Sequence, residues 1–150
     1  MIDISVLTEY DGEVAAAMGR LRHQLSVRHD GSPIEREKIE EIIESPYHDI
    51  LLAIDESDKI VGMAIVSIVM ATIDRNTYLE DFVVDENCRG KGIGGQMLEA
   101  VKNWARKKGC RRLEFTSINR EKKGGANGFY ESHGAIMRDT HCFRVELQEK

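Results

Sequence analysis

Residues 83–95 read VVDENCRGKGIGG, and this stretch decides how the rest of the chain is interpreted. An apolar run enters a basic, glycine-rich turn, and an amphipathic helical pattern follows at once. Glycines allow backbone N–H groups to approach a bulky anion, and the following helix offers the positive end of its dipole. Arg89 and Lys91 add positive charge. The stretch therefore predicts a cradle for a pyrophosphate group.

Other glycine-rich motifs are alternatives to this interpretation. Residues 90–95 match the G-x-G-x-x-G pattern of dinucleotide-binding folds, and Glu114 lies about 20 residues further on. We reject that fold because hairpin patterns precede the motif, because Glu114 begins the next strand, and because too little chain follows for a parallel sheet. The P-loop pattern G-x-x-x-x-G-K-[ST] is absent from the sequence. A glycine-rich helix start that binds no ligand remains open.

Strand and helix patterns alternate along the chain. Alternating apolar residues predict strands, and a 3.6-residue period predicts helices. Ser32, Pro33 and Glu35 predict a capping box at the start of the second helix. Residues 56–59 predict a hairpin turn. We expect strands at residues 2–7, 49–55, 60–70, 77–84, 112–118 and 142–147, with an extra short strand near Ile136, and helices at residues 13–27, 33–44, 92–108 and 126–133.

Composition limits the class of protein. At 150 residues with a net charge of -5, the chain is expected to form a single domain, residues 1–150, that does not bind nucleic acid. We see no signal peptide and no apolar run long enough to cross a bilayer. The three cysteines are far apart, which argues against disulfides and metal and favours the cytoplasm. The negative charge either suits a cationic substrate or only keeps the protein soluble.

Two segments carry a family resemblance. Arg89-x-x-Gly92-x-Gly94 resembles the R/Q-x-x-G-x-G/A motif of the GNAT superfamily of acyl-CoA-dependent N-acyltransferases. Residues 126–135, ANGFYESHGA, resemble that superfamily's A-x-x-F-Y-x-x-x-G-F/A segment. Residues 78–82, YLEDF, look like the spermidine/spermine N-acetyltransferase branch. The resemblance implies an α+β, three-layer fold, in which a mixed and mostly antiparallel sheet has helices on both faces. It also implies acetyl-CoA as co-substrate and a homodimer.

The resemblance assigns the cofactor-binding residues. Phe82, Val83 and Val84 would pair their backbone with the pantetheine arm of acetyl-CoA, as an added strand pairs with a sheet edge. The pyrophosphate would lie against the turn, mainly on backbone N–H groups, within a set formed by Arg89, Gly90, Lys91, Gly92, Ile93, Gly94 and Gly95.

The resemblance also assigns two catalytic residues. Glu80 would act as the base that takes a proton from the amine, and strict alternation would place it on one strand face with Tyr78, Phe82 and Val84. Tyr130 matches the family tyrosine and would donate to the leaving thiolate. An ordinary tyrosine has a pKa about 1.5 units above that of a thiol, so a hydrogen bond is favoured over full proton transfer.

The chain departs from the family pattern at one position. Lys123 stands where many members carry Asn, and either Asn119 or Asn127 could substitute. Cys88 lies beside Arg89 at a helix start, so a covalent acyl-cysteine intermediate is an alternative mechanism. The family resemblance favours direct transfer instead. His133 and His141 are expected at the surface or at a helix end, and the histidines show no metal-ligand spacing.

The sequence thus predicts an N-acetyltransferase that moves an acetyl group from acetyl-CoA to a primary amine in a ternary complex. The acceptor classes left open are polyamine-like small amines, amino-acid derivatives, aminoglycosides and protein amino groups. The alternative is a non-catalytic acyl-CoA-binding regulatory module, against which the presence of both Glu80 and Tyr130 argues.

Overall fold

The computed structural model describes residues 1–117 and 126–148. It contains two compact units, Met1–Phe115 and Thr116–Lys150, which are described one at a time. Whether they act as the single domain expected from the sequence stays a prediction. The elements in chain order are β1 (Asp3–Val6), α1 (Gly12–Leu25), α2 (Arg36–Glu44), β2 (His48–Ile54), β3 (Ile60–Met70), β4 (Arg75–Val84), the 3-10 turn η1 (Glu86–Cys88), α3 (Ile93–Lys107), β5 (Leu113–Glu114) and α4 (Ala126–Ser132).

The first unit is built on a mixed sheet in the order β1-β2-β3-β4-β5. The first four strands pair antiparallel, and β5 pairs parallel with β4 after the α3 crossover. The predicted turn at residues 56–59 is confirmed, since Asp55 Oδ1 accepts from the backbone N–H groups of Ser57 and Lys59. The mixed, mostly antiparallel sheet confirms the predicted fold class.

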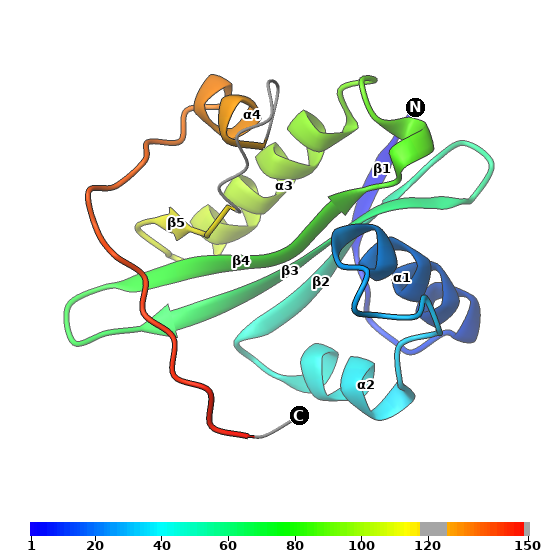
Figure 1. Cartoon of the computed structure of the whole chain (residues 1–150), viewed down its shortest axis with the longest axis horizontal. Coiled ribbons are helices and arrows are strands. Elements are labelled where there is room, and N and C mark those ends of the chain that lie inside the picture. The colour runs from blue at the N-terminus through cyan, green and yellow to red at the C-terminus, as the bar shows by residue number, and fades with distance from the viewer. Residues whose placement is uncertain (118–125, 149–150) are drawn as a thin grey trace. The chain divides into compact units, whose positions relative to one another are not determined.

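Helices cover both faces of this sheet (Figure 1). On one face, α1 and α2 bury Met18, Leu21 and Ile39 against sheet residues such as Met63 and Val83. On the other face lies α3, whose buried apolar residues recur at helical spacing: Met97, Leu98, Val101, Trp104 and Ala105. No helix in the described residues is long and apolar enough to cross a membrane.

The second helix begins later than its sequence predicts. Asp11 caps α1 by accepting from the N–H groups of Glu13 and Val14, but no side chain caps α2. The predicted capping box at Ser32 is wrong because this segment makes tertiary contacts with α1 instead of capping α2. The Ile34 N–H donates to Ala15 O at 3.0 Å. A Cβ atom on Gly19 would lie 2.0 Å from Ser32 O, so this glycine lets the segment lie directly on α1.

The second unit contains α4, which confirms the predicted short helix, and an extended segment that follows it (Figure 1). The helix stops at Gly134, whose φ of 90° suits glycine. The strands expected at residues 142–147 and near Ile136 do not form in the described part of this unit. A strand needs a neighbour to satisfy its backbone, and alternation in sequence does not supply one.

Candidate active site

The turn at residues 89–95 has the geometry of an anion cradle. Gly90 and Gly92 have φ angles of 76° and 79°, in the left-handed region where side chains are disfavoured. A Cβ atom built on either glycine meets no atom of the described residues within 4 Å, so these residues leave space open beside both glycines. The first bond of α3 runs from Gln96 N–H to Gly92 O. The backbone N–H groups of residues 93–95 come before this first helical hydrogen bond. Gly92 is the N-cap residue of α3, and no side-chain hydrogen bond caps the helix there.

Three parts of the first unit hold the segment that leads into this turn. Asp85 N–H donates to Val61 O of β3, and the Asp85 carboxylate accepts from Asn87 N–H. Lys59 Nζ lies 3.8 Å from Asp85 Oδ2. Gln24 of α1 accepts from Glu86 N–H at 2.8 Å. These contacts fix the entry to the cradle from β3, from the β2–β3 turn and from α1.

The charge on Asp85 is favoured by its surroundings. Burial alone would raise the pKa of this carboxyl group. The hydrogen bond from Asn87 and the positive charge of Lys59 outweigh burial and hold the pKa below its ordinary value. Asp85 is therefore an ionised anchor at neutral pH, and we assign it a structural role.

Arg89 has a structural contact within the predicted cradle. Its Nε donates to Val84 O at 3.0 Å, which ties the turn to the end of β4. Lys91 is exposed, whereas Ile93 is 5% exposed and anchors the first turn of α3 in the core. The predicted cradle residues are thus brought together, with backbone N–H groups and Lys91 at the open side.

β4 contains a bulge that changes which residues share a face. Met63 pairs with Val83, but Ile65 pairs with Glu80, so one extra residue of β4 lies between these pairs. Glu80 therefore shares its face with Tyr78 and Val83, whereas Val84 lies on the opposite face beside α3. The prediction that strict alternation aligns Tyr78, Glu80, Phe82 and Val84 is wrong, because a bulge reverses the alternation.

The face that carries Glu80 is the one covered by α1 and α2, because Val83 and its partner Met63 belong to that core. Glu80 is exposed at the edge of this core and Tyr78 is half-buried. β5 pairs with β4 only at Thr77 and Tyr78. Among the described residues, the pairing of β4 with β5 thus ends at Tyr78, before β4 reaches Val83 and Val84.

Asp81, which follows Glu80 at the bulge, is a further candidate. Its φ is 46°, a left-handed conformation that aspartate tolerates better than most residues. Although part of the side chain reaches solvent, desolvation by the surrounding protein raises the pKa of its carboxyl group. The positive charges of Arg22 and His29 act in the opposite direction. Asp81 therefore lies within electrostatic reach of α1 and the loop after it, close to Glu80.

The loop between α1 and α2 is held against α1 on this side of the sheet. The imidazole Nδ1 of His23 donates to the carbonyl of His29, and Ser32 N–H donates to Asp30 Oδ1 at 2.9 Å. The structure thus brings this loop into reach of Asp81. The consecutive carboxylates of Glu80 and Asp81 in an otherwise apolar strand are the signal by which the sequence could have indicated this site.

Tyr130, the predicted acid, lies on α4 in the second unit. Burial raises the pKa of its phenol above the ordinary value. Its ring contacts Phe129 edge to face, with centroids 5.2 Å apart. The pairing of Tyr130 with Glu80 in one site stays a prediction.

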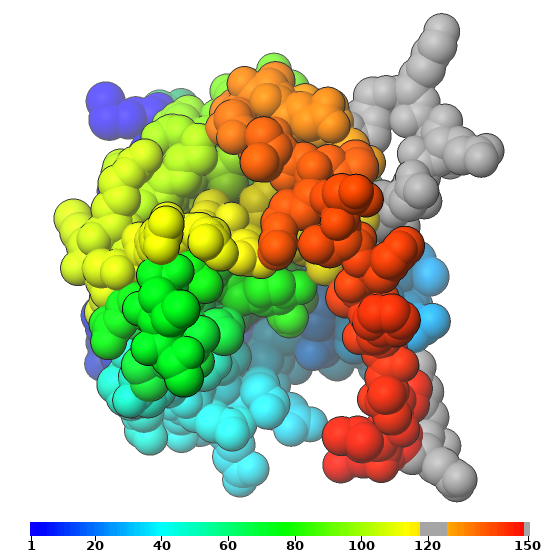
Figure 2. Space-filling view, turned by 90° about the vertical axis from the view of Figure 1, so that its left-hand side faces the viewer, coloured from blue at the N-terminus to red at the C-terminus, as the bar shows by residue number. Residues whose placement is uncertain are grey.

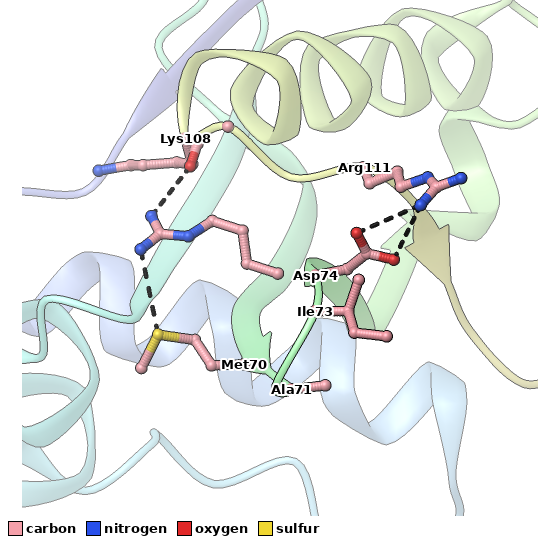
Figure 3. Close-up of a pocket in the computed structure, with 8 residues that line it drawn as sticks. Met70, Ala71, Ile73, Asp74, Lys108 and Arg111 are labelled. Atoms are coloured by element: carbon pink, nitrogen blue, oxygen red, sulfur yellow. Dashed lines mark hydrogen bonds and ion pairs between the residues drawn. The ribbon is translucent and has the colours of Figure 1, made fainter.

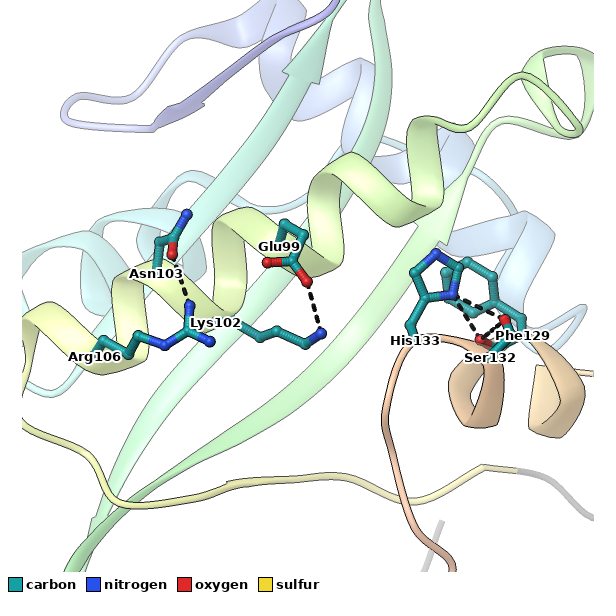
Figure 4. A network of polar contacts seen from close by, with 7 residues as sticks. All are labelled: Glu99, Lys102, Asn103, Arg106, Phe129, Ser132 and His133. Carbon is teal, nitrogen blue, oxygen red and sulfur yellow. Dashed lines mark hydrogen bonds and ion pairs between the residues drawn. The ribbon is translucent and has the colours of Figure 1, made fainter.

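His133 has the helix-end role expected for it. Its Nδ1 donates to Phe129 O at 2.8 Å, and its ring lies 4.4 Å from the Phe129 ring, centroid to centroid (Figure 4). The same figure shows local pairs along α3, from Lys102 to Glu99 and from Arg106 to Asn103, each within one helix turn. We assign these local contacts on α3 no catalytic role.

An open concavity of about 490 Å³ lies at the other end of α3. Arg111 pairs with Asp74 there, and the Arg75 guanidinium donates to the backbone carbonyl of Lys108 (Figure 3). The length of α3, about 22 Å, separates it from the glycine turn. It is therefore distinct from the cradle.

Fewer observations support a role in the site for the other candidate residues. Cys88 is half-buried and all three cysteines are free thiols. The described residues contain no group of three or more His, Cys, Asp or Glu side chains that could hold a metal. Lys123 and Asn119 lie outside the described residues. Asn127 is half-buried on α4.

Comparison with known proteins identifies the family. Residues 20–135 match the model of the acetyltransferase (GNAT) family. The chain is 37% identical over 76 residues to thialysine N-epsilon-acetyltransferase of Bos taurus, a match that covers 48% of this chain and 44% of the relative. It is 29% identical over 135 residues to the Mus musculus protein of that name, covering 79% and 76%. The chain thus matches less than half of the length of the bovine relative.

The fold is also that of solved acetyltransferases. An aminoglycoside acetyltransferase from an uncultured soil metagenomic sample superposes with a TM-score of 0.84, covering 98% of this chain and 97% of that one, at 21% identity. Such low identity supports the fold and not the substrate. Together with the glycine turn at the start of α3, the family match over most of the chain leads to one conclusion. The chain belongs to the acetyltransferase (GNAT) family.

Proposed function

We propose that this protein transfers an acetyl group from acetyl-CoA to a primary amine by direct attack in a ternary complex. The observation that carries the proposal is the open glycine turn at the N-terminus of α3, directly after a bulged strand that presents two carboxylates. Family membership supports acetyl-CoA as the donor. The open space at Gly90 and Gly92 fits a pyrophosphate, because nothing described fills it.

The residues of the first unit would bind the donor at two points. Backbone N–H groups of residues 93–95, with Lys91, would hold the pyrophosphate. The backbone of Val83 and Val84 would pair with the pantetheine arm beyond the part of β4 that pairs with β5. Acetyl-CoA supplies the activated acetyl group as a thioester, whose C–S bond breaks as the amine nitrogen bonds to the carbonyl carbon.

The carboxylates of β4 would serve the amine. Glu80 would accept the proton that the ammonium group must lose before it can attack. Asp81 would hold the cationic substrate at the bulge, near the α1–α2 loop. Tyr130 would donate a hydrogen bond to the departing sulfur. Its raised pKa makes complete proton transfer to a thiolate still less favourable, so hydrogen bonding is the role we assign.

Two carboxylates favour a positively charged acceptor. Thialysine, named in the bovine and mouse relatives, is one amine to test first. Polyamines, other amino-acid derivatives, aminoglycosides and protein amino groups complete the panel. A cytoplasmic location, independence from metal and a homodimeric state stay predictions that belong to this proposal.

The test combines two measurements on the whole chain. Calorimetry should show acetyl-CoA binding, and thiol release should follow addition of at least one amine of the panel. Mass spectrometry of the product should show the acetyl group on nitrogen. Tight binding without turnover on any amine would instead support a non-catalytic acyl-CoA-binding module and overturn the proposal.

A further inference from the structure

Gln24 of α1 joins two parts of the first unit that are 62 positions apart in the sequence. Its Oε1 accepts a hydrogen bond from the backbone N–H of Glu86 at 2.8 Å. Leu21 of the core lies three residues earlier, on the same side of the helix, so Gln24 continues the face of α1 that packs on the sheet. Glu86 begins η1, and the first N–H of a helical turn has no partner within that turn. Gln24 supplies this partner from another element.

The same side chain acts on Asp85. Burial raises the pKa of the Asp85 carboxyl group, whereas hydrogen bonds from Asn87 and Gln24 and the charge of Lys59 hold the pKa below its ordinary value. Because the Gln24 oxygen accepts from Glu86, the group that donates to Asp85 is the amide NH2. Both ends of one amide are therefore used on two consecutive residues, which fixes its orientation.

These two residues lead directly into the glycine turn. Cys88 N–H donates to Asp85 O at 2.8 Å, which closes η1. Gly90 and Gly92 follow, with φ angles of 76° and 79°, and glycine offers little resistance to a change of direction. The direction in which the turn leaves the sheet is thus determined by η1, which Gln24 holds against α1.

We propose that Gln24 is a positioning residue for the donor. By holding Asp85 and Glu86 against α1, it keeps the N–H groups of residues 93–95 directed toward the pyrophosphate. It acts through these two residues and not by contact with acetyl-CoA. The inference rests on the proposed function, because it takes the turn as the acetyl-CoA site. It goes further in assigning part of the donor affinity to a residue of α1, far from the glycine motif in sequence.

Gln24→Leu tests this role, because it removes both hydrogen bonds and keeps a similar side-chain size. Calorimetry should show the Kd of acetyl-CoA raised about five- to tenfold, the usual effect of losing such hydrogen bonds. Steady-state kinetics should show a raised KM for acetyl-CoA, with kcat at saturating donor and the KM of the amine unchanged. An unchanged Kd for acetyl-CoA would overturn the inference.

Asp49→Leu is the matched control. It removes a hydrogen bond of the same length, 2.8 Å from Trp104 Nε1, between β2 and α3. Trp104 is about 18 Å along α3 from Gly92. It lies near the end of α3 that adjoins the β3–β4 turn, drawn in green in Figure 2. This variant should lower the melting temperature and leave the Kd of acetyl-CoA unchanged. Equal weakening of binding by both variants would mean general destabilisation and would contradict the positioning role.

An exchange of donor and acceptor gives a rescue test. Gln24→Glu keeps an oxygen for Glu86 N–H but places a second carboxylate beside Asp85, so acetyl-CoA binding should weaken. Adding Asp85→Asn supplies an amide donor to the introduced carboxylate and should recover most of the affinity. Circular dichroism checks that each variant is folded. Losses that simply add in the double variant would contradict the inference.

Amide hydrogen exchange without any ligand separates this inference from the proposed function. Gln24→Leu should speed exchange at Glu86 and Cys88, whereas Asp49→Leu should leave both rates unchanged. Unchanged exchange at Glu86 in Gln24→Leu would overturn the positioning role even if acetyl-CoA binds. If the unmodified chain binds no acetyl-CoA, the proposed function fails, and the donor role of Gln24 fails with it, whatever the exchange rates.

Discussion

Tyr130 combines a family position with a raised pKa. If it donates a hydrogen bond to the departing sulfur, then Tyr130→Phe should lower kcat by about 10²-fold, as loss of a donor to a developing negative charge does. The affinity for acetyl-CoA should change little, because the cradle lies on other residues. Steady-state kinetics and calorimetry measure the two quantities.

A matched control for this variant is Tyr47→Phe, which removes a hydroxyl group from an exposed tyrosine outside the proposed site. It should leave kcat unchanged. A Tyr130→Phe enzyme with near-normal kcat would remove Tyr130 from the mechanism, whatever the effect on stability.

The negative charge of Asp81 should strengthen the binding of a cationic substrate but lower the stability of the folded chain. Asp81→Asn keeps the shape and tolerates the left-handed backbone, but it loses the charge. We expect the KM for a cationic amine to rise about 10- to 100-fold, which is the range for a hydrogen bond to a charged group. Glu80→Gln should instead act mainly on kcat. If Asp81→Asn and Glu80→Gln change KM by the same factor and also change kcat by the same factor, these separate roles are contradicted.

The pH dependence of stability follows from the raised pKa of Asp81. The folded chain holds this proton more tightly than the unfolded chain, so ionisation costs stability as pH rises from the ordinary aspartate pKa through the raised one. Above that window Asp81→Asn should therefore melt at a slightly higher temperature than the unmodified protein, and below it the difference should vanish. Thermal unfolding between pH 3 and 8, about the range that spans both protonation states, measures this.

At the scale of elements, local patterns predict the helices and strands that bury an apolar stripe. The helix at residues 93–107 was predictable because its apolar spacing, its glycine start and its basic last turn agree. The β4 bulge was not, because the extra residue is visible only when β4 is paired with β3. The start of α2 was misplaced for a similar reason, since contacts with α1 determine the path of residues 32–35.

The same limit applies to the site. The glycine turn is local, so the sequence predicts both its place and its ligand class. The position of Asp81 depends on the bulge, and the pKa of its carboxyl group depends on Arg22 and His29, which are far away in sequence. Likewise, the alternation at residues 142–147 predicts a strand, but no strand forms there among the described residues.

The glycine turn makes a prediction at the element scale. Gly92→Ala places a side chain at a φ of 79°, which costs about 1–2 kcal/mol of stability or forces the turn to change. Either result should weaken acetyl-CoA binding about tenfold or more, because the N–H groups of residues 93–95 follow directly. Denaturant unfolding and calorimetry measure the two effects.

Gly109→Ala separates strain from binding. Gly109 follows α3 at its other end and has a φ of 71°, so alanine there carries a similar backbone cost. It should lower stability to a similar extent and leave acetyl-CoA affinity intact. If both glycine variants weaken binding equally, general destabilisation rather than the cradle would account for the loss.

At the scale of the whole molecule, the net charge of -5 and the carboxylates of β4 should attract cationic acceptors. We expect kcat/KM to fall as ionic strength rises from about 0.01 to 0.15 M, over which the Debye length shrinks from about 30 to 8 Å. The fall should be steeper for a triamine than for a monoamine, because each added positive charge interacts with the same field. Measuring several amines at fixed acetyl-CoA saturation separates this effect from donor binding. If the salt dependence is the same for acceptors of every charge, the net charge serves only to keep molecules apart, and the acceptor is recognised by contacts at the site alone.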